Sequence, residues 1–229
     1  MSFLRLVTFF IATGLLYLGI PLLGWGLDDV IGYSSNAARL GYALLVGLFS
    51  LAVGLQAFSS TEGIRGRKGE AGKFVFRQRI VRVVLVLSLY IALFFIPFFD
   101  RHAMGVFNDG SVARCLGVVL SALGFALVFW SGVALGRQYS ADVTIQKEHH
   151  LISSGVYRVI RHPRYLGIIA LSIGISCVFR SWIGLIASLF FLAILSFRIR
   201  DEESMMLKEF GTQWEAYCKH SWRLIPYIY

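Results

Sequence analysis

Long apolar segments are the feature of this sequence that most restricts its fold. The hydrocarbon core of a bilayer is about 30 Å thick, and a helix needs about 20 apolar residues to cross it. Segments of this kind recur along the 229 residues, of which 57% are hydrophobic and only 15% are charged. In hydrocarbon every backbone polar group must be paired, which limits spanning structures to helices and closed barrels. The sequence therefore predicts an all-α, polytopic membrane helix bundle.

Six membrane segments can be drawn, and the last two are short. Arg180 and Ser181 separate these two segments. Each holds roughly 15 apolar residues, about 22 Å of helix, so we predict a short helical hairpin that is tilted across the bilayer or partly immersed in it. We treat 1–229 as a single membrane domain, with generic transmembrane helices in 1–135 and the candidate site in 136–229. The six segments are 3–24, 37–59, 80–99, 112–136, 166–180 and 182–197.

The distribution of charge predicts the orientation of the chain. The 61–82 loop carries seven Lys and Arg residues against two Glu, whereas the loop near Asp28 and Asp29 is acidic. The positive-inside rule then places both termini, the 61–82 loop, the 137–165 loop and a C-terminal helix in the cytoplasm. The net charge of +9 is mainly a result of this topology and partly an attraction for anionic lipids. Because the basic residues flank membrane segments, no nucleic-acid partner is expected.

The cysteines and histidines form no metal-binding pattern. Cys115, Cys177 and Cys218 are scattered along the chain, which is typical of small apolar packing residues. His149 and His150 are adjacent, so their side chains point in different directions on any regular element. We therefore predict no metal site.

A first polar cluster precedes the short hairpin and contains Tyr157, Arg161, His162, Pro163 and Tyr165. The proline disfavours helix at His162 and favours the start of a helix at its own position. The cluster is then displayed at a helix N-terminus, where backbone N–H groups can hold an anion. The alternative is a basic interfacial anchor with its tyrosines in the aromatic belt of the membrane.

A second polar cluster follows the hairpin. Arg198 and Glu202 are four residues apart, so they share one helix face and lie within pairing distance, while Arg200 and Glu203 are expected to point elsewhere. The pair is either a surface ion pair contributing under about 1 kcal/mol, or a preorganised pair facing a polar cavity.

These clusters are parts of a longer pattern in the last third of the chain. The pattern consists of His149-His150-Leu151-Ile152, Gly155-x-Tyr157, Arg161-His162-Pro163-x-Tyr165-x-Gly167, Arg198-x-x-x-Glu202-Glu203, Phe210-Gly211-x-x-Trp214-x-x-Tyr217 and Arg223-Leu224-Ile225-Pro226. It resembles the isoprenylcysteine carboxyl methyltransferase family, one of a wider group of integral membrane methyltransferases that includes phospholipid N-methyltransferases. The resemblance covers residues 135–229, and its combined spacing is specific.

The resemblance implies S-adenosylmethionine as methyl donor, bound on the cytoplasmic side, and a lipidic or prenylated acceptor that enters from the bilayer. It also implies a role for Arg198 in holding the acceptor's carboxylate, with Arg198 and Glu202 as the candidate catalytic residues. The implied cofactor-binding residues are Gln146, His149, His150, Leu151, Ile152, Tyr157, His162, Pro163, Tyr165 and Glu202.

The chemistry of methyl transfer suits these residue types. Transfer from a sulfonium depends mainly on positioning, and a carboxylate acceptor is already ionised, so it needs a cation such as Arg198 rather than a base. An amine acceptor would need a base, for which Glu202 or Glu203 are candidates. We therefore predict a membrane S-adenosylmethionine-dependent methyltransferase that prefers carboxyl O-methylation of isoprenylcysteine. N-methylation of a phospholipid or small amine stays open, as does a non-enzymatic transporter or structural membrane protein with two interfacial anchors.

Overall fold

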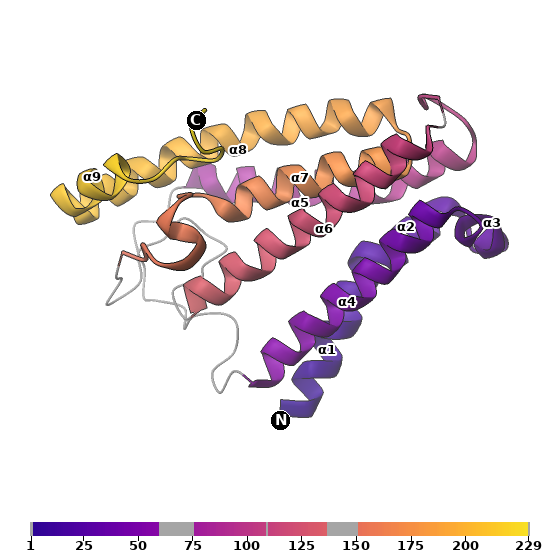
Figure 1. Cartoon of the computed structure of the whole chain (residues 1–229), viewed down its shortest axis with the longest axis horizontal. Coiled ribbons are helices and arrows are strands. Elements are labelled where there is room, and N and C mark those ends of the chain that lie inside the picture. Colours follow the sequence, from indigo (N-terminus) through magenta and orange to yellow (C-terminus); the bar gives the residue numbers. More distant parts are fainter. Residues whose placement is uncertain (1, 60–75, 109, 137–150, 229) are drawn as a thin grey trace.

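The regular structure of the chain is helical. The computed structural model describes residues 2–59, 76–108, 110–136 and 151–228, and within these ranges the only β-type pairings are two isolated bridges (Figure 1). The predicted all-α fold is confirmed. The helices are α1 (Ser2–Gly14), the π-helical turn η1 (Leu15–Gly19), α2 (Ile20–Trp25), η2 (Leu27–Asp29), α3 (Val30–Ser34), α4 (Ala37–Ser59), α5 (Phe76–Arg101), α6 (Ser111–Leu135), η4 (Gly155–Arg158), α7 (Pro163–Val178), α8 (Trp182–Phe210) and α9 (Thr212–Lys219).

The membrane segments follow the apolar pattern of the sequence. Within the described ranges, five helical stretches are long and apolar enough to cross a bilayer, and α7 is a shorter apolar helix of 16 residues. The first stretch, Phe3–Trp25, is continuous through α1, η1 and α2. These stretches together with α7 account for the six predicted segments, and the chain is an integral, multi-pass membrane protein.

The two arms of the predicted hairpin differ in length. Arg180 and Ser181 join α7 to α8, and the Ser181 hydroxyl caps α8 by accepting a hydrogen bond of 3.0 Å from the Gly184 amide. The segment predicted to end at residue 197 continues as helix to Phe210, where Gly211 has a φ of 49°. A positive φ is accessible to glycine because it has no Cβ atom. The second polar cluster therefore lies on the last turns of a 29-residue helix, not beyond it.

Glycines bring α6 and α7 into close contact. A Cβ atom at Gly124 would lie 2.7 Å from the Leu171 amide nitrogen and 2.8 Å from the Gly167 carbonyl oxygen. A Cβ atom at Gly174 would lie 2.8 Å from the Gly117 carbonyl oxygen. Small residues allow such close backbone approach in membrane helix pairs. The position of α7, which begins at the first polar cluster, is therefore fixed against α6.

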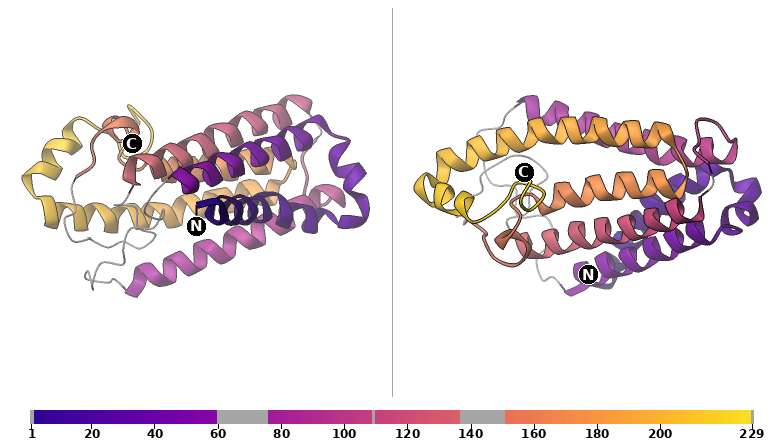
Figure 2. Two further views of the ribbon diagram at one scale, coloured as in Figure 1. Left: turned by 90° about the horizontal axis from the view of Figure 1, so that it is seen from below. Right: turned by 45° about the horizontal axis from the view of Figure 1, so that its top comes forward.

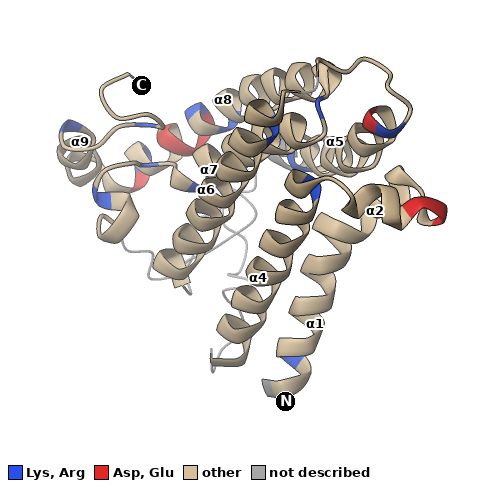
Figure 3. Cartoon of the chain, turned by 45° about the vertical axis from the view of Figure 1, so that its right-hand side comes forward, with Lys and Arg blue, Asp and Glu red and all other residues tan. Residues whose placement is uncertain are grey.

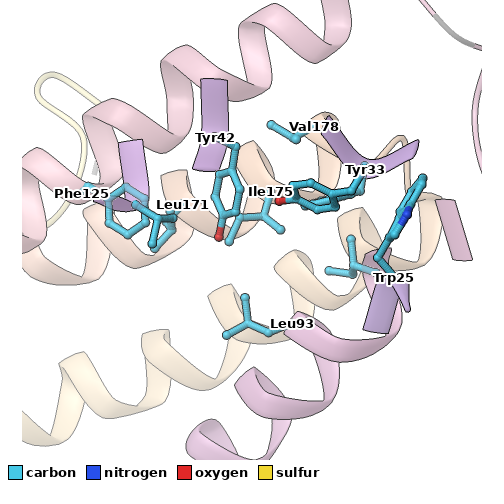
Figure 4. Close-up of a cluster of buried hydrophobic side chains, with 11 residues drawn as sticks. Trp25, Tyr33, Tyr42, Leu93, Phe125, Leu171, Ile175 and Val178 are labelled. Carbon is cyan, nitrogen blue, oxygen red and sulfur yellow. The ribbon is translucent and has the colours of Figure 1, made fainter. Parts of the chain in front are cut away.

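The apolar core lies where the amino-terminal helices meet α6 and α7. Tyr42 and Val46 of α4 are fully buried, and Tyr42 donates a hydrogen bond of 2.8 Å to the Tyr17 carbonyl oxygen. Figure 4 shows Tyr42 between Phe125 of α6 and Ile175 of α7. This packing holds α4 against the α6–α7 pair, and both halves of the chain therefore belong to one helix bundle.

The charged residues gather toward the ends of the helices (Figure 3). At the end formed by α3, the α5–α6 connection and the α7–α8 turn, Asp100 is surrounded by three arginines. Its carboxylate oxygens lie 3.1 Å from Arg39 Nη1, 3.2 Å from Arg114 Nη1 and 2.8 Å from Arg180 Nη2. We call these four residues the distal cluster.

The opposite end of the bundle carries the predicted site. The N-terminus, the last turns of α4 and α6, the start of α7 and the helix α9 all lie toward this end (Figure 1). Figure 2 shows α9 turning back from the end of α8, so that the C-terminal tail returns to the segment before α7. The parallel bridge between Ile160 and Trp222 fixes this return.

Candidate active site at the α7–α8 end

Local sequence sets the start of α7 as predicted. His162 is the N-cap residue with φ −125° and ψ 56°, and Pro163 occupies the first helical turn. The proline cannot donate a backbone hydrogen bond and excludes helix at the preceding residue. His162 is consequently held at the mouth of the helix, with only 9% of its surface exposed.

Three of the predicted site residues meet between α7 and α8. Tyr165 donates a short hydrogen bond to Glu202 Oε1. Arg198 Nε lies 2.8 Å from the Tyr165 hydroxyl oxygen and 3.3 Å from Glu202 Oε1. The predicted pairing of Arg198 with Glu202 on one helix face is therefore confirmed, and the phenol of Tyr165 joins it from the neighbouring helix.

Glu203 points away from the Arg198–Glu202 pair, as expected, but it contacts a second set of charged residues. Glu203 is buried and its two carboxylate oxygens contact Arg161 Nε at 3.0 Å and Arg223 Nε at 2.7 Å. His162 lies between the two glutamates, with Nδ1 3.6 Å from Glu202 Oε2 and Nε2 3.4 Å from Glu203 Oε1. Neighbouring helical side chains diverge by about 100°. A third element placed between them can nevertheless contact both, and here that element is the start of α7.

The C-terminal tail completes the cluster. The Arg161 amide donates to the Trp222 carbonyl at 2.7 Å, and the His162 amide donates to the Arg223 carbonyl at 3.0 Å. The Arg161 guanidinium also donates to the carbonyl oxygens of Ser221 and Cys218. Arg161 and Arg223 belong to the motifs, but sequence spacing gives no indication that they share the Glu203 carboxylate, which is 42 residues from Arg161 and 20 from Arg223.

The remaining predicted residues lie at different distances from this cluster. Tyr157 is buried beside α9, where its carbonyl oxygen accepts a hydrogen bond of 2.6 Å from the Tyr217 hydroxyl. Burial raises the pKa of Tyr157, and burial also raises the pKa of Tyr217 to about 12, so both phenols are neutral near pH 7. Leu151 and Ile152 are half-buried at the start of the described segment. Gln146, His149 and His150 lie outside the described residues.

The site combines fixed and titratable charge. We call Arg161, His162, Tyr165, Arg198, Glu202, Glu203 and Arg223 the site cluster. Burial by itself would lower the pKa of His162, but the adjoining carboxylates of Glu202 and Glu203 outweigh burial and raise that pKa above its ordinary value. With three arginines and two glutamates, the cluster has a surplus of positive charge even when His162 is neutral. Such a site can hold an anion beside a polarised phenol.

The family model described as phospholipid methyltransferase matches residues 112–213, which run from the start of α6 to the start of α9. A probable protein-S-isoprenylcysteine O-methyltransferase of Oryza sativa subsp. indica is 29% identical over 116 residues, which are 49% of this chain and 61% of that protein. A solved structure of the eukaryotic intramembrane Ras methyltransferase, isoprenylcysteine carboxyl methyltransferase, matches 99% of this chain and 95% of its own. Its TM-score is 0.50 at 18% sequence identity, so it supports the fold alone.

The chain is similar to members of the isoprenylcysteine carboxyl methyltransferase family. The resemblance stated from the motifs is thus confirmed at the level of the family. A Delta(14)-sterol reductase of Mus musculus is also similar, at 37% identity over 82 residues, or 34% of this chain and 20% of that protein. The chain therefore covers less than two thirds of the length of these two curated relatives, the reductase and the rice methyltransferase.

Proposed function

We propose that this protein is an integral membrane methyltransferase that uses S-adenosylmethionine to methylate a carboxylate on a lipid-linked acceptor, with isoprenylcysteine as the preferred acceptor. The observation that carries the proposal is the meeting of Arg198, Tyr165 and Glu202 between α7 and α8. These residues come from the segment matched by the methyltransferase family model, 112–213.

The residues at this end fit the donor. S-adenosylmethionine carries a carboxylate, an ammonium and a sulfonium, so a pocket for it needs groups of both signs. The site cluster offers the carboxylates of Glu202 and Glu203 and the cations of Arg161 and Arg223. We propose that Glu202 and Tyr165 line the donor pocket together with Tyr157, Pro163, Leu151 and Ile152, and that Gln146, His149 and His150 extend it. When bound, the donor supplies an electrophilic methyl group.

The balance of charge favours an acid over an amine as acceptor. The arginines of the site cluster outnumber its glutamates, and the donor's sulfonium adds a further positive charge. A carboxylate neutralises this surplus, whereas a protonated amine increases it. Arg198 is suited to orient the carboxylate because its guanidinium is planar and already positioned by Tyr165 and Glu202.

An amine acceptor is the second candidate, because the matching family model bears the description phospholipid methyltransferase. In that chemistry a base must take a proton from the amine. Glu202 is the candidate base, since it already accepts a hydrogen bond from Tyr165. The rate would then rise with pH as the free amine forms, whereas methylation of a carboxylate does not require deprotonation above the acid's own pKa.

Binding measurements test the enzyme class. Titration calorimetry of the detergent-purified protein with S-adenosylhomocysteine should show saturable binding, and Glu202→Gln should weaken it at least several-fold. Glu209→Gln, at an exposed position near the end of the same helix, is the matched control and should bind like the wild type. Binding of a reduced nicotinamide dinucleotide in place of S-adenosylhomocysteine would instead favour the reductase-like relative.

The acceptor is identified by transfer of a labelled methyl group. Prenylcysteine analogues, phospholipids and small amines are offered separately, and the products are tested for base-labile methyl esters. Esterification of the prenylcysteine analogue supports the proposal, whereas label confined to base-stable N-methyl products refutes the carboxylate assignment.

We propose further that the site and both termini face the cytoplasm, where S-adenosylmethionine is available. The bias of basic residues toward the 61–82 loop supports this orientation. A cysteine introduced at Gly69 should react with an impermeant reagent only from the cytoplasmic side, and one at Asn108 only from the opposite side. The three native cysteines are first replaced by serine. Reversed labelling contradicts the orientation.

A further inference from the structure

His162 lies between the carboxylates of Glu202 and Glu203. Its Nδ1 faces Glu202 at 3.6 Å and its Nε2 faces Glu203 at 3.4 Å. Its ring lies parallel to that of Tyr165, with the centroids 5.6 Å apart. Within the described structure Nε2 is buried without a hydrogen-bond partner, so its contact with Glu203 is electrostatic.

This arrangement constrains the proton state of the imidazole. A neutral imidazole has one N–H and one lone pair, whereas the imidazolium has two N–H groups. With a carboxylate oxygen facing each nitrogen, a neutral ring would direct its lone pair at one of the two anions. The imidazolium is attracted electrostatically to both carboxylates, so the geometry favours the charged form, and the raised pKa of His162 agrees with it.

The two carboxylates belong to two different parts of the site. Glu202 is tied to Tyr165 and Arg198, the residues proposed to hold donor and acceptor. Glu203 is tied to Arg161, whose guanidinium binds the tail carbonyls, and to Arg223 of the tail itself. The imidazole of His162 is the link between these two groups.

We propose that His162 is a positioning residue whose imidazolium bridges Glu202 and Glu203 and thereby ties the C-terminal tail to the methyl-transfer residues. This inference rests on the proposed function of the site, and it gives His162 a different role from that of a cofactor ligand through its ring nitrogens. The bridge requires the proton, so the orientation of Glu202 depends on the ionisation of His162.

The sign of the pH dependence follows from the raised pKa. The bridge is complete below the ordinary histidine pKa of about 6.5, and it is lost as the pH rises through the higher pKa of the folded protein. The charged groups facing His162 are Glu202 and Glu203 from α8, with Arg198, Arg161, Arg223 and the phenol of Tyr165 around them. Carboxyl methylation should therefore decline at alkaline pH.

The experiment follows the titration of His162 directly. A protein in which the other four histidines are replaced by glutamine retains one imidazole, whose ¹⁵N signals are recorded against pH in nanodiscs without donor or acceptor. The four replaced residues are His102, His149, His150 and His220. We expect a pKa clearly above 6.5 in this protein, and a decrease on the order of one unit when Glu203→Gln is added, because one of the two anions is removed.

Activity is compared among the wild type, Glu203→Gln and Glu209→Gln with the other histidines present. In the wild type, the decline of kcat at alkaline pH should coincide with the titration of His162. This decline should move to lower pH in Glu203→Gln and should stay in place in Glu209→Gln. A purely structural Glu203 would lower the amount of folded protein without moving the decline, and that result overturns the proposal. If Glu203→Gln does not fold, a His162 pKa at or below 6.5 in the otherwise wild-type site overturns it.

The measurement separates this proposal from the proposed function. If the pKa of His162 is raised but the protein does not bind S-adenosylhomocysteine, the bridge is supported and the methyltransferase function is refuted. If the protein binds S-adenosylhomocysteine and methylates a carboxylate but the pKa of His162 is ordinary, the methyltransferase function is supported and the bridge is refuted.

Discussion

The distal cluster and the site cluster are both buried groups of charge, but they are built from different residues. In the distal cluster three arginines surround Asp100, and none of the four side chains is more than 18% exposed. In the site cluster two glutamates are shared by arginines, a histidine and a tyrosine. One cluster has a single titratable carboxylate, whereas the other has several groups whose protons can move.

This difference in composition indicates that the two clusters have different roles in the protein. A guanidinium carries a fixed positive charge, and the distal cluster holds three of them around one carboxylate. Its members come from the start of α4, the end of α5, the start of α6 and the α7–α8 turn, and Arg39 and Arg114 also donate to the Tyr33 and Val178 carbonyls. It joins helix ends and serves stability. The site cluster can change its charge, which suits binding and turnover.

Asp100→Asn should give the largest loss of stability. It removes the one carboxylate of the distal cluster and leaves buried guanidiniums without their counter-ion, at a cost of about 3–5 kcal/mol. Thermal unfolding of the purified protein in detergent measures the effect. Glu202→Gln, in the site cluster, should instead retain most of the stability and lose S-adenosylhomocysteine binding. A wild-type melting curve for Asp100→Asn would contradict the structural role of the distal cluster.

A matched pair of arginine substitutions separates the clusters by function. Arg198→Lys retains a charge but loses the guanidinium contacts to Tyr165 and Glu202, so kcat/KM should fall by the equivalent of about 2–5 kcal/mol. Arg180→Lys makes the same change beside Asp100 and should lower the melting temperature while leaving kcat/KM of the folded fraction unchanged. Equal effects of both variants on turnover would remove the distinction between the clusters.

The contact between α6 and α7 links the two clusters, because α7 begins directly after His162 and ends at Val178, close to Arg180. Gly124→Val places methyl groups where the Leu171 amide lies within 2.7 Å of the Cβ position, and such overpacking costs about 1–3 kcal/mol. Both stability and methyl transfer should decrease. Gly132→Val on the same helix is the control, since nothing lies within 4 Å of that Cβ position.

The smallest effect is expected from the exposed ion pair near the distal cluster. The hydrogen bond from Arg101 lowers the pKa of Asp28 to about 2. A lowered carboxyl pKa adds stability above its unfolded value of 3.8, and this contribution is lost as the pH falls toward 2. Asp28→Asn should therefore lower the melting temperature at pH 7 by about one degree at most, and the difference from the wild type should disappear as the pH falls toward 2.

The helical segments could be predicted because bilayer thickness imposes one length on every crossing. The pattern of apolar residues therefore gave six segments, and the proline after His162 gave the start of α7. The end of α8 could not be placed, because apolar character ends near residue 197 while the polar residues that follow are equally good helix formers. The end of the apolar run indicates where the helix leaves the membrane, whereas Gly211 indicates where the helix itself ends.

The pairing of Arg198 with Glu202 was determined by the sequence alone, because residues four apart on a helix are neighbours whatever surrounds them. The contacts of Glu203 were decided only by the tertiary structure. Its partners Arg161 and Arg223 come from the segment before α7 and from the tail, which backbone hydrogen bonds join. Asp100 likewise meets Arg39 across 61 positions of sequence. Local spacing fixes which side chains share a helix face, but only the packing of distant segments determines which charge stands opposite them.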